Sequence, residues 1–177
     1  KKPCEFILTS DEEVGLIGAS ALSFDLKSKN LLNLDSEDEA EVYIGCAGGV
    51  DIEAVKNYES VLDSGTFYEI TISGLPGGHS GVEIHKNIPN AIKLFGDFLK
   101  DHQVKIASLE GGERRNSIPV NVKAVIQCDF PLESQENIEV KKLEGSFNVI
   151  EGSEIVKLLQ NFENGVLSFN ESLQVPG

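Results

Sequence analysis

Apolar and polar residues alternate along two stretches in the middle of the chain. In the first, from Tyr68 to Ile72, every second residue is apolar. In the second, six apolar residues occupy alternate positions: Val120, Val122, Ala124, Ile126, Cys128 and Phe130. A period of two is typical of strands with one buried and one solvated face. The pattern therefore predicts an antiparallel sheet that contains both stretches, with a further strand at 103–109.

Two other stretches show a helical spacing of apolar residues. One helix is expected over 87–101, capped by Asn87, with Pro89 in its first turn and Ile92, Phe95, Phe98 and Leu99 on its buried face. A second is expected to start at Ser153, to end before Gly165, and to bury Ile155, Val156, Leu159 and Phe162. Segment 131–147 shows no clear period, and only a weak strand is expected near 138–140. Residues 51–177 thus predict an α+β domain, an antiparallel sheet with helices on one face.

The first 50 residues have a different pattern. Three short apolar runs, 5–9, 31–34 and 42–46, indicate strands, and good helix-forming residues follow the first of them from Leu16 to Leu22. The first two runs end in carboxylates, so two strands are expected to deliver acidic residues to one edge. Gly48 and Gly49 form a natural hinge. We therefore expect residues 1–50 to be part of an α/β domain, separate from 51–177.

Composition and charge narrow the class of protein. With 40% apolar and 25% charged residues the chain is an ordinary globular sequence, and no apolar run approaches the ~20 residues that cross a bilayer. A formal charge of −14 argues against nucleic acid as a partner. Three cysteines without C-x-x-C spacing fit reduced thiols in a cytoplasmic protein. The absence of methionine and the Lys1-Lys2-Pro3 start predict a processed or internal piece.

The first candidates for catalytic or metal-binding residues are acids that are adjacent in the sequence or lie at the ends of neighbouring predicted strands. Glu12 and Glu13 leave a strand end in different directions, so one could ligate a metal while the other accepts a proton from a metal-bound water. Acid pairs before helices also serve helix-terminus electrostatics, and on the residues alone that interpretation is the stronger one. Asp35, at the end of a second strand, could share the same cation or could belong to a solvated acidic loop.

Four strings of residues carry a resemblance to a known family. They are ILTSDEEVGLIGA, LDSEDEAEVYIGCAGG, GLPGGHSGVEIHKNIPNAIKL and EGGERRNSIP, in this order along the chain. In order and approximate spacing they resemble the aminoacyl-histidine dipeptidases (peptidase D type) of the two-zinc exopeptidases. The resemblance covers about two thirds of the chain. It implies part of a catalytic sheet at 1–50 followed by the lid, or dimerisation, domain of that family at 51–177.

The resemblance assigns roles to the acids. Glu12 is similar to the general base that takes a proton from the bridging water, Glu13 to a zinc ligand, and Asp35 to the ligand of the other zinc. In that family two zinc ions (Zn2+), about 3.5 to 4 Å apart, polarise the scissile carbonyl and activate the water. The family's upstream His-x-Asp motif, its bridging Asp and its C-terminal His ligand have no counterpart in these 177 residues.

The resemblance also implies substrate contacts from the lid. His79 is similar to the lid histidine that reaches the substrate carbonyl and stabilises the oxyanion. Asn116 is similar to the asparagine that contacts the C-terminal carboxylate, and Arg115 could add charge there, although an arginine beside a glycine turn is more often solvated. A later lid arginine is expected near Gly165, where the sequence has none.

The expected function is part of a zinc dipeptidase that hydrolyses Xaa-His and related unblocked dipeptides, inactive as this chain alone. One alternative is a non-catalytic lid-type module that forms a homodimer or another protein interaction. A second alternative keeps the metal chemistry but takes an acylated amino acid or a tripeptide as substrate.

Overall fold

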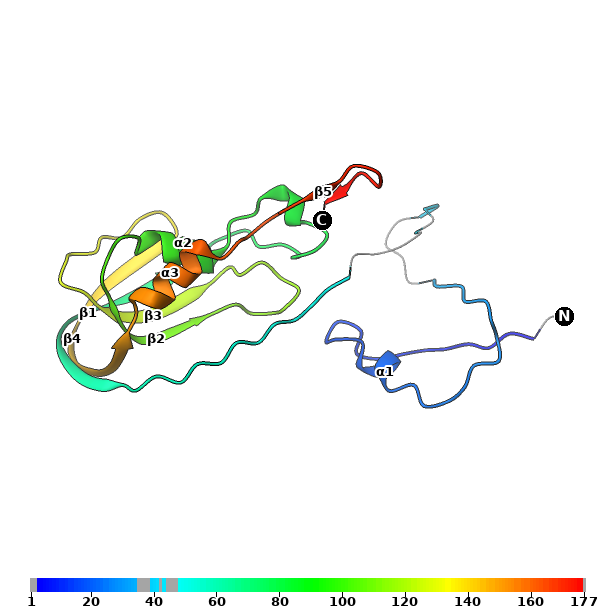
Figure 1. The fold of residues 1–177 in the computed structure, drawn as a ribbon, viewed down its shortest axis with the longest axis horizontal. Coiled ribbons are helices and arrows are strands. Elements are labelled where there is room, and N and C mark those ends of the chain that lie inside the picture. The colour runs from blue at the N-terminus through cyan, green and yellow to red at the C-terminus, as the bar shows by residue number, and fades with distance from the viewer. Residues whose placement is uncertain (1–2, 35–38, 42, 44–47, 177) are drawn as a thin grey trace. The chain divides into compact units, whose positions relative to one another are not determined.

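The computed structural model describes residues 3–34, 39–41, 43 and 48–176. The chain divides into two compact units, Lys1–Cys46 and Ala47–Gly177 (Figure 1). The boundary expected from the sequence lies at residue 50. Each unit is described by itself below.

The second unit is built on four long antiparallel strands: β1 (Val61–Ile72), β2 (Lys105–Gly111), β3 (Val122–Gln127) and β4 (Ile138–Glu151). β1 pairs with β3 on one side and with β4 on the other, and β2 pairs with β3 along most of its length. The end of β4 also reaches β2, where Lys105 pairs with Glu151, so the pairings close into a ring. Two short strands, β5 (Phe169–Asn170) and β6 (Val175–Pro176), form a separate hairpin.

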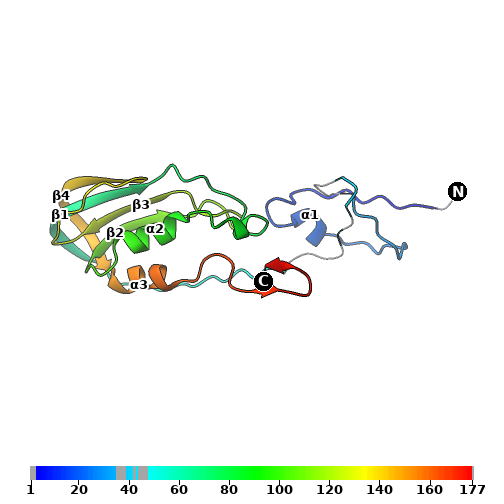
Figure 2. The same cartoon turned by 90° about the horizontal axis from the view of Figure 1, so that it is seen from above.

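Helices α2 (Ala91–Phe98) and α3 (Ser153–Asn161) cover one face of this sheet (Figure 2). The core between the layers combines sheet and helix residues, all at most 8% exposed: Tyr68, Ile70, Ile72, Ala91, Phe95, Leu99, Val122, Ala124, Ile126 and Val156. The apolar face expected along β1 and β3 is thus the buried one. This architecture confirms the predicted α+β domain with an antiparallel sheet and helices on one face.

The largest difference from the sequence prediction is β4. Fourteen residues form this strand, where only a weak strand near 138–140 was expected. Its register with β1 is continuous, from Ile72 opposite Ile138 to Val61 opposite Val149. Most of its side chains are exposed or half-buried, so the strand lacks an apolar period. The backbone ladder with β1, rather than side-chain burial, holds it in place.

The ends of the helices also correct the prediction. Asn87 does not cap α2: it lies in the left-handed region, with φ 52°, at the end of a 3₁₀ turn (η1, Ile84–Lys86). The N-cap is Asn90, whose Oδ1 accepts hydrogen bonds from the backbone amides of Ile92 and Lys93. α3 begins at Ser153 as expected but ends at Asn161, and Phe162 is 69% exposed instead of buried.

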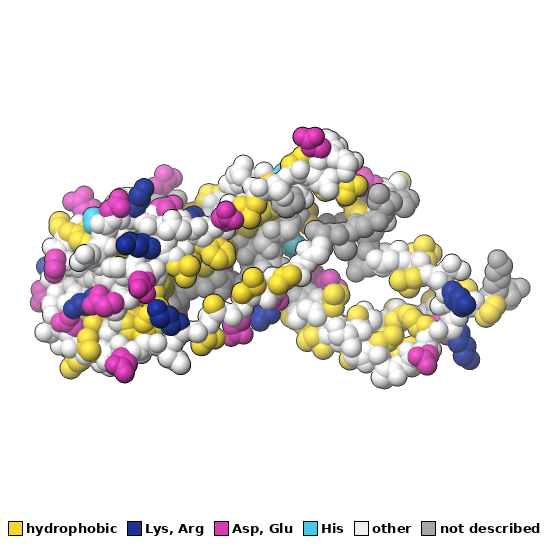
Figure 3. All heavy atoms as spheres, in the orientation of Figure 1, with side chains coloured by type: hydrophobic (Ala, Val, Ile, Leu, Met, Phe, Trp, Pro, Cys, Tyr) yellow, Lys and Arg dark blue, Asp and Glu magenta, His cyan; other side chains and the backbone are white. Residues whose placement is uncertain are grey.

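The first unit contains one short helix, α1 (Ile17–Ser20), and no strand among its described residues. The strands expected at 5–9 and 31–34 are therefore wrong for this structure, and the third, at 42–46, lies outside the described residues except for Tyr43. A strand needs a second strand to pair with its backbone N–H and C=O groups, and the described residues of 5–9 and 31–34 form no such ladder. Their apolar side chains stay exposed, among them Phe6 at 90% and Leu8 at 97%, and Figure 3 shows hydrophobic side chains on the surface of this unit.

Replacing the N-cap tests the register of α2. Asn90→Ala removes the acceptor for two backbone amides and the bond from Nδ2 to Asn164 Oδ1, at 2.8 Å. We expect the free energy of unfolding to fall by about 1 kcal/mol, measured by urea denaturation. Asn90→Asp is the matched control, since it keeps the capping oxygen and loses only the donor. Equal losses in both variants would show that the contact with Asn164, rather than the cap, stabilises the helix.

Candidate functional site

Two loops of the second unit are joined backbone to backbone. One contains Gly77 to Gly81 and the other runs from Glu113 to Pro119. The amide of Ile118 donates to the carbonyl of Gly78 at 2.8 Å, and the amide of Ser80 donates to the carbonyl of Asn116 at 2.9 Å. These bonds pair His79 with Ser117 in an isolated β-bridge. The structure thus brings His79 and Asn116, which are 37 positions apart in the sequence (116 − 79), onto facing loops.

Glycines make this close approach feasible. Gly77 has φ +68°, a conformation that side chains disfavour, and a Cβ there would lie 2.7 Å from Val120 Cγ1. A Cβ on Gly78 would lie 2.4 Å from Ile88 Cδ1. The loop can therefore pass close to its neighbours only because both residues lack a side chain.

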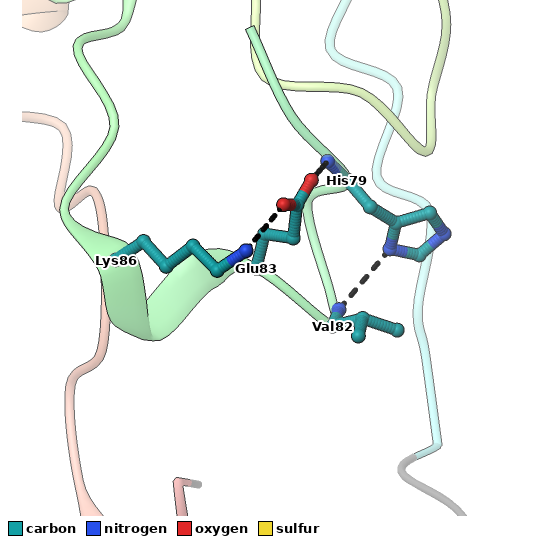
Figure 4. Close-up of polar contacts among 4 residues, drawn as sticks. All are labelled: His79, Val82, Glu83 and Lys86. Carbon is teal, nitrogen blue, oxygen red and sulfur yellow. Dashed lines mark hydrogen bonds and ion pairs between the residues drawn. The ribbon is translucent and has the colours of Figure 1, made fainter. Parts of the chain in front are cut away.

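The imidazole of His79 is held by its own loop (Figure 4). Its Nδ1 accepts hydrogen bonds from the backbone amides of Gly81 at 3.0 Å and Val82 at 3.1 Å. In the opposite direction, the backbone amide of His79 donates to Glu83 Oε2 at 2.9 Å. Nε2, the other ring nitrogen, makes no hydrogen bond to any described residue. The ring therefore presents one free nitrogen.

Glu83 is itself fixed by a basic neighbour. Its Oε1 receives the ammonium of Lys86 at 2.6 Å, in an ion pair one turn along the chain. The Lys86 hydrogen bond, followed by the bond from the His79 amide, holds the pKa of Glu83 below its usual 4.5. Glu83 is therefore ionised wherever the loop is intact at neutral pH, and it accepts as a carboxylate.

The second loop is held by Glu113. Its Oε1 accepts from the backbone amide of Asn121 at 3.1 Å and from the Asn121 side chain at 2.9 Å, while Oε2 accepts from the Val120 amide at 3.4 Å. Burial opposes ionisation of this carboxyl, but the bonds from Asn121 and the backbone amides outweigh it and lower its pKa. Glu113 thus ties the loop that carries Asn116 to the start of β3.

The two polar candidates on this loop differ in their surroundings. Arg115 Nη1 lies 2.9 Å from Asp51 Oδ2, with both side chains more than 70% exposed. Asn116 is exposed, and no hydrogen bond joins its side chain to that of His79 within the described residues. Arg115 therefore has an ion-pair partner, which a substrate carboxylate would have to displace, whereas the two loops present His79 and Asn116 through backbone pairing alone.

The acids of the first unit lie on a turn. The carbonyl of Glu12 accepts from the amides of Gly15 and Leu16, both at 3.1 Å, and the carboxylates of Glu12 and Glu13 are exposed. Asp35 lies outside the described residues. In the part of the chain that the structure describes, no three His, Cys, Asp or Glu side chains gather as a metal site would require. Zinc usually takes four ligands in structural sites and three protein ligands in catalytic ones, so these residues do not complete a zinc site by themselves.

The sequence analysis missed the residues that hold the two loops. Glu83 comes four positions after His79, close to the spacing of a helix capping box, in which a polar residue and a later Glu accept each other's backbone amides. That spacing could have indicated its role. Glu113 accepts hydrogen bonds from residues seven and eight positions later in the chain, and no local sequence pattern indicates contacts at that separation. Asp51 pairs with Arg115 across 64 positions and could be found only in the fold.

Comparison with known proteins finds dipeptidases among the relatives of this chain. The sequence is 40% identical over 131 residues to the cytosol non-specific dipeptidase of Escherichia coli (strain K12), covering 70% of this chain and 27% of that protein. The structure matches the crystal structure of aminoacylhistidine dipeptidase from Vibrio alginolyticus with a TM-score of 0.66 and 29% identity, over 94% of this chain and 41% of that one. No family model matches the sequence.

The helix-covered antiparallel sheet thus matches the lid, or dimerisation, domain of a dipeptidase. The chain belongs to the peptidase D-like dipeptidases, as its motifs predicted. It spans about a quarter of the length of the curated relative and about two fifths of the solved structure. Among the described residues no helix is long and apolar enough to cross a membrane.

A methyl group at Gly77 should loosen the site. Gly77→Ala adds the left-handed strain of about 1–2 kcal/mol and a contact with Val120, so the unfolding midpoint in urea should fall. Gly48→Ala is the matched control, because its Cβ meets nothing within 4 Å and its φ is not in the left-handed region. Equal stability of the two variants would contradict the close packing of the Gly77 loop.

Acid should release the second loop. Because the pKa of Glu113 is lowered in the fold, its contribution is present above the usual value of 4.5 and is lost as the pH falls through the lowered pKa. We expect the amide resonance of Asn121 to titrate with a midpoint below 4.5 in an NMR pH series. Glu113→Gln should abolish that titration. A midpoint at or above 4.5 would show that the carboxylate does not hold the loop.

Proposed function

We propose that this chain supplies the lid and part of the catalytic domain of a cytoplasmic zinc dipeptidase that hydrolyses unblocked dipeptides, Xaa-His among them. The observation that carries the proposal is the backbone pairing of the His79 loop with the Asn116 loop, in a chain whose relatives are dipeptidases. Both loops carry the motifs by which the sequence resembles that family. The pairing supports a shared role in holding one small substrate.

Each loop would contribute one contact to the substrate. The free ring nitrogen of His79 would donate to the scissile carbonyl oxygen and stabilise the negative charge that develops there. The amide of Asn116 is a neutral donor suited to the C-terminal carboxylate. Arg115 could add positive charge near that carboxylate after leaving Asp51. We assign it a smaller role than Asn116, because Asp51 competes with the substrate for the guanidinium.

Zinc would supply the Lewis acid and the activated water of this reaction. Glu13 and Asp35 would each give one carboxylate ligand, and Glu12 would accept the proton of the attacking water. Support comes from the family resemblance and from the exposure of both Glu12 and Glu13 on one turn. The remaining ligands would correspond to the family's His-x-Asp motif, bridging Asp and C-terminal His, which have no counterpart in these 177 residues.

Substitution of His79 in the intact dipeptidase tests the lid contact. For Ala-His hydrolysis, His79→Ala should lower kcat about 10²- to 10³-fold with little change in KM, as expected for a donor to the oxyanion. Asn116→Ala should mainly raise KM, because it removes a contact made by the bound substrate. His85→Ala is the control, because this exposed histidine lies on η1, outside the loops 77–81 and 113–119. An unchanged kcat in His79→Ala would contradict the proposed role.

Zinc titration of the 177-residue chain by calorimetry tests the sharing of the metal site. Weak or absent binding is expected, because two carboxylates are too few for a stable site. Sub-micromolar binding that is lost in both Glu13→Gln and Asp35→Asn would instead mean a self-contained site. Failure of the intact protein to hydrolyse any dipeptide would favour the alternative, a lid-type dimerisation module.

A further inference from the structure

The His79 loop repeats the hydrogen bonding of a helix capping box, with a histidine in the place of serine or threonine. In a capping box, the first side chain accepts from backbone amides two or three positions later, and a later Glu accepts from the first residue's amide. Here His79 Nδ1 accepts from the amide of Gly81. It also accepts from the amide of Val82, and Glu83 Oε2 accepts from the His79 amide (Figure 4). The turn that follows, η1, is short, so the motif closes a loop rather than starting a long helix.

This arrangement determines which ring nitrogen carries the proton. A neutral imidazole has one N–H donor and one acceptor nitrogen. Two backbone amides point at Nδ1, so Nδ1 must be the acceptor and the proton must sit on Nε2. The tautomer follows from these two backbone donors and requires no metal or substrate.

We infer that Glu83 is a positioning residue, which fixes the backbone of His79 so that Nδ1 stays against the two amides and Nε2 stays protonated and free to donate. Its effect on catalysis rests on the proposed function, in which His79 donates to the substrate carbonyl. Its effect on the tautomer does not.

The surroundings of Glu83 match this role. Lys86 takes Oε1 and so leaves Oε2 directed at the His79 amide. Gly78 leaves the space, since a Cβ there would lie 3.0 Å from the same Oε2. The Gly-Gly-His-Ser-Gly string and the glutamate two positions after it thus form one unit, in which the glycines admit the carboxylate and the carboxylate orients the histidine.

The tautomer can be read directly by long-range ¹H–¹⁵N NMR of the ¹⁵N-histidine-labelled chain, above the pH at which free imidazole ionises. We expect Nδ1 of His79 to resonate as an unprotonated nitrogen and Nε2 as a protonated one. In Glu83→Ala the resonances should move toward the averaged values of His85, an exposed histidine that serves as internal reference. Glu83→Gln, which keeps an acceptor for the His79 amide, should restore the wild-type pattern, and Lys86→Met should leave it largely unchanged.

Two results would overturn the inference. The first is an Nδ1-protonated or averaged His79 in the wild-type chain. The second is an unchanged tautomer in Glu83→Ala, provided that the methyl resonances of the Ile70 and Ile126 core show the fold to be intact. If Glu83→Ala unfolds, Glu83→Gln and Lys86→Met still test the inference. Averaged ring resonances of His79 in Glu83→Gln, but not in Lys86→Met, would show that an oxygen accepting from the His79 amide is not sufficient to fix the tautomer.

The catalytic consequence is measured separately in the intact dipeptidase. Glu83→Ala should lower kcat roughly tenfold or more while KM stays within a few-fold, and Glu83→Gln should recover most of the loss. A correct tautomer together with an unaffected kcat in both His79→Ala and Glu83→Ala would reject the proposed function and leave the positioning of the ring intact. A changed tautomer with an unaffected kcat in Glu83→Ala alone would reject the catalytic part of the inference.

Discussion

The second unit depends on the pairing of β1 with two partners. β1 pairs with β4 over 12 residue positions and with β3 over six. Its backbone therefore fixes the positions of both neighbouring strands. One face of β1 meets α2 and α3 through Tyr68, Ile70 and Ile72, and Phe67 on the opposite side packs against Phe147 of β4 at 4.6 Å between ring centroids. Because β1 ends just before the glycine-rich segment, this strand also sets where the His79 loop begins. The site is therefore an extension of the sheet at one end of its central strand.

The loops of the candidate site are stabilised by carboxylates that accept backbone amides, which is a different principle from the packing of the sheet. Glu83 and Glu113 each hold one loop, and their hydrogen bonds lower the pKa of both carboxyls. Exposed ion pairs contribute little to stability. The contribution of Glu83 and Glu113 is geometric, since a carboxylate that accepts two hydrogen bonds fixes the direction of the chain within a loop.

The sequence predicted the packed sheet better than the loops that are held by carboxylates. The strands with one buried face, β1 and β3, were predicted because burial imposes a period of two, and Cys128 continues that period into the core. Only the first residues of β4 were expected as a strand, because the side chains that follow, such as Lys141 and Lys142, are exposed and only the backbone is constrained. Asn90 was overlooked as the cap because Asn87 lies three positions earlier, on the other side of Pro89, and is the same type of residue. His79 and Asn116 came from the family motifs, whereas Glu83 and Glu113 act through side chain-to-backbone bonds that no apolar pattern reports.

The occupied Nδ1 of His79 has a consequence for the kind of chemistry that this ring can perform. A histidine that relays protons must accept at one nitrogen while it releases from the other. Two peptide N–H groups already donate to Nδ1, at 3.0 and 3.1 Å. This nitrogen can therefore accept a proton only if the turn opens. The imidazole of this loop is therefore suited to donate from Nε2, and in the proposed reaction the proton of the attacking water would pass to Glu12.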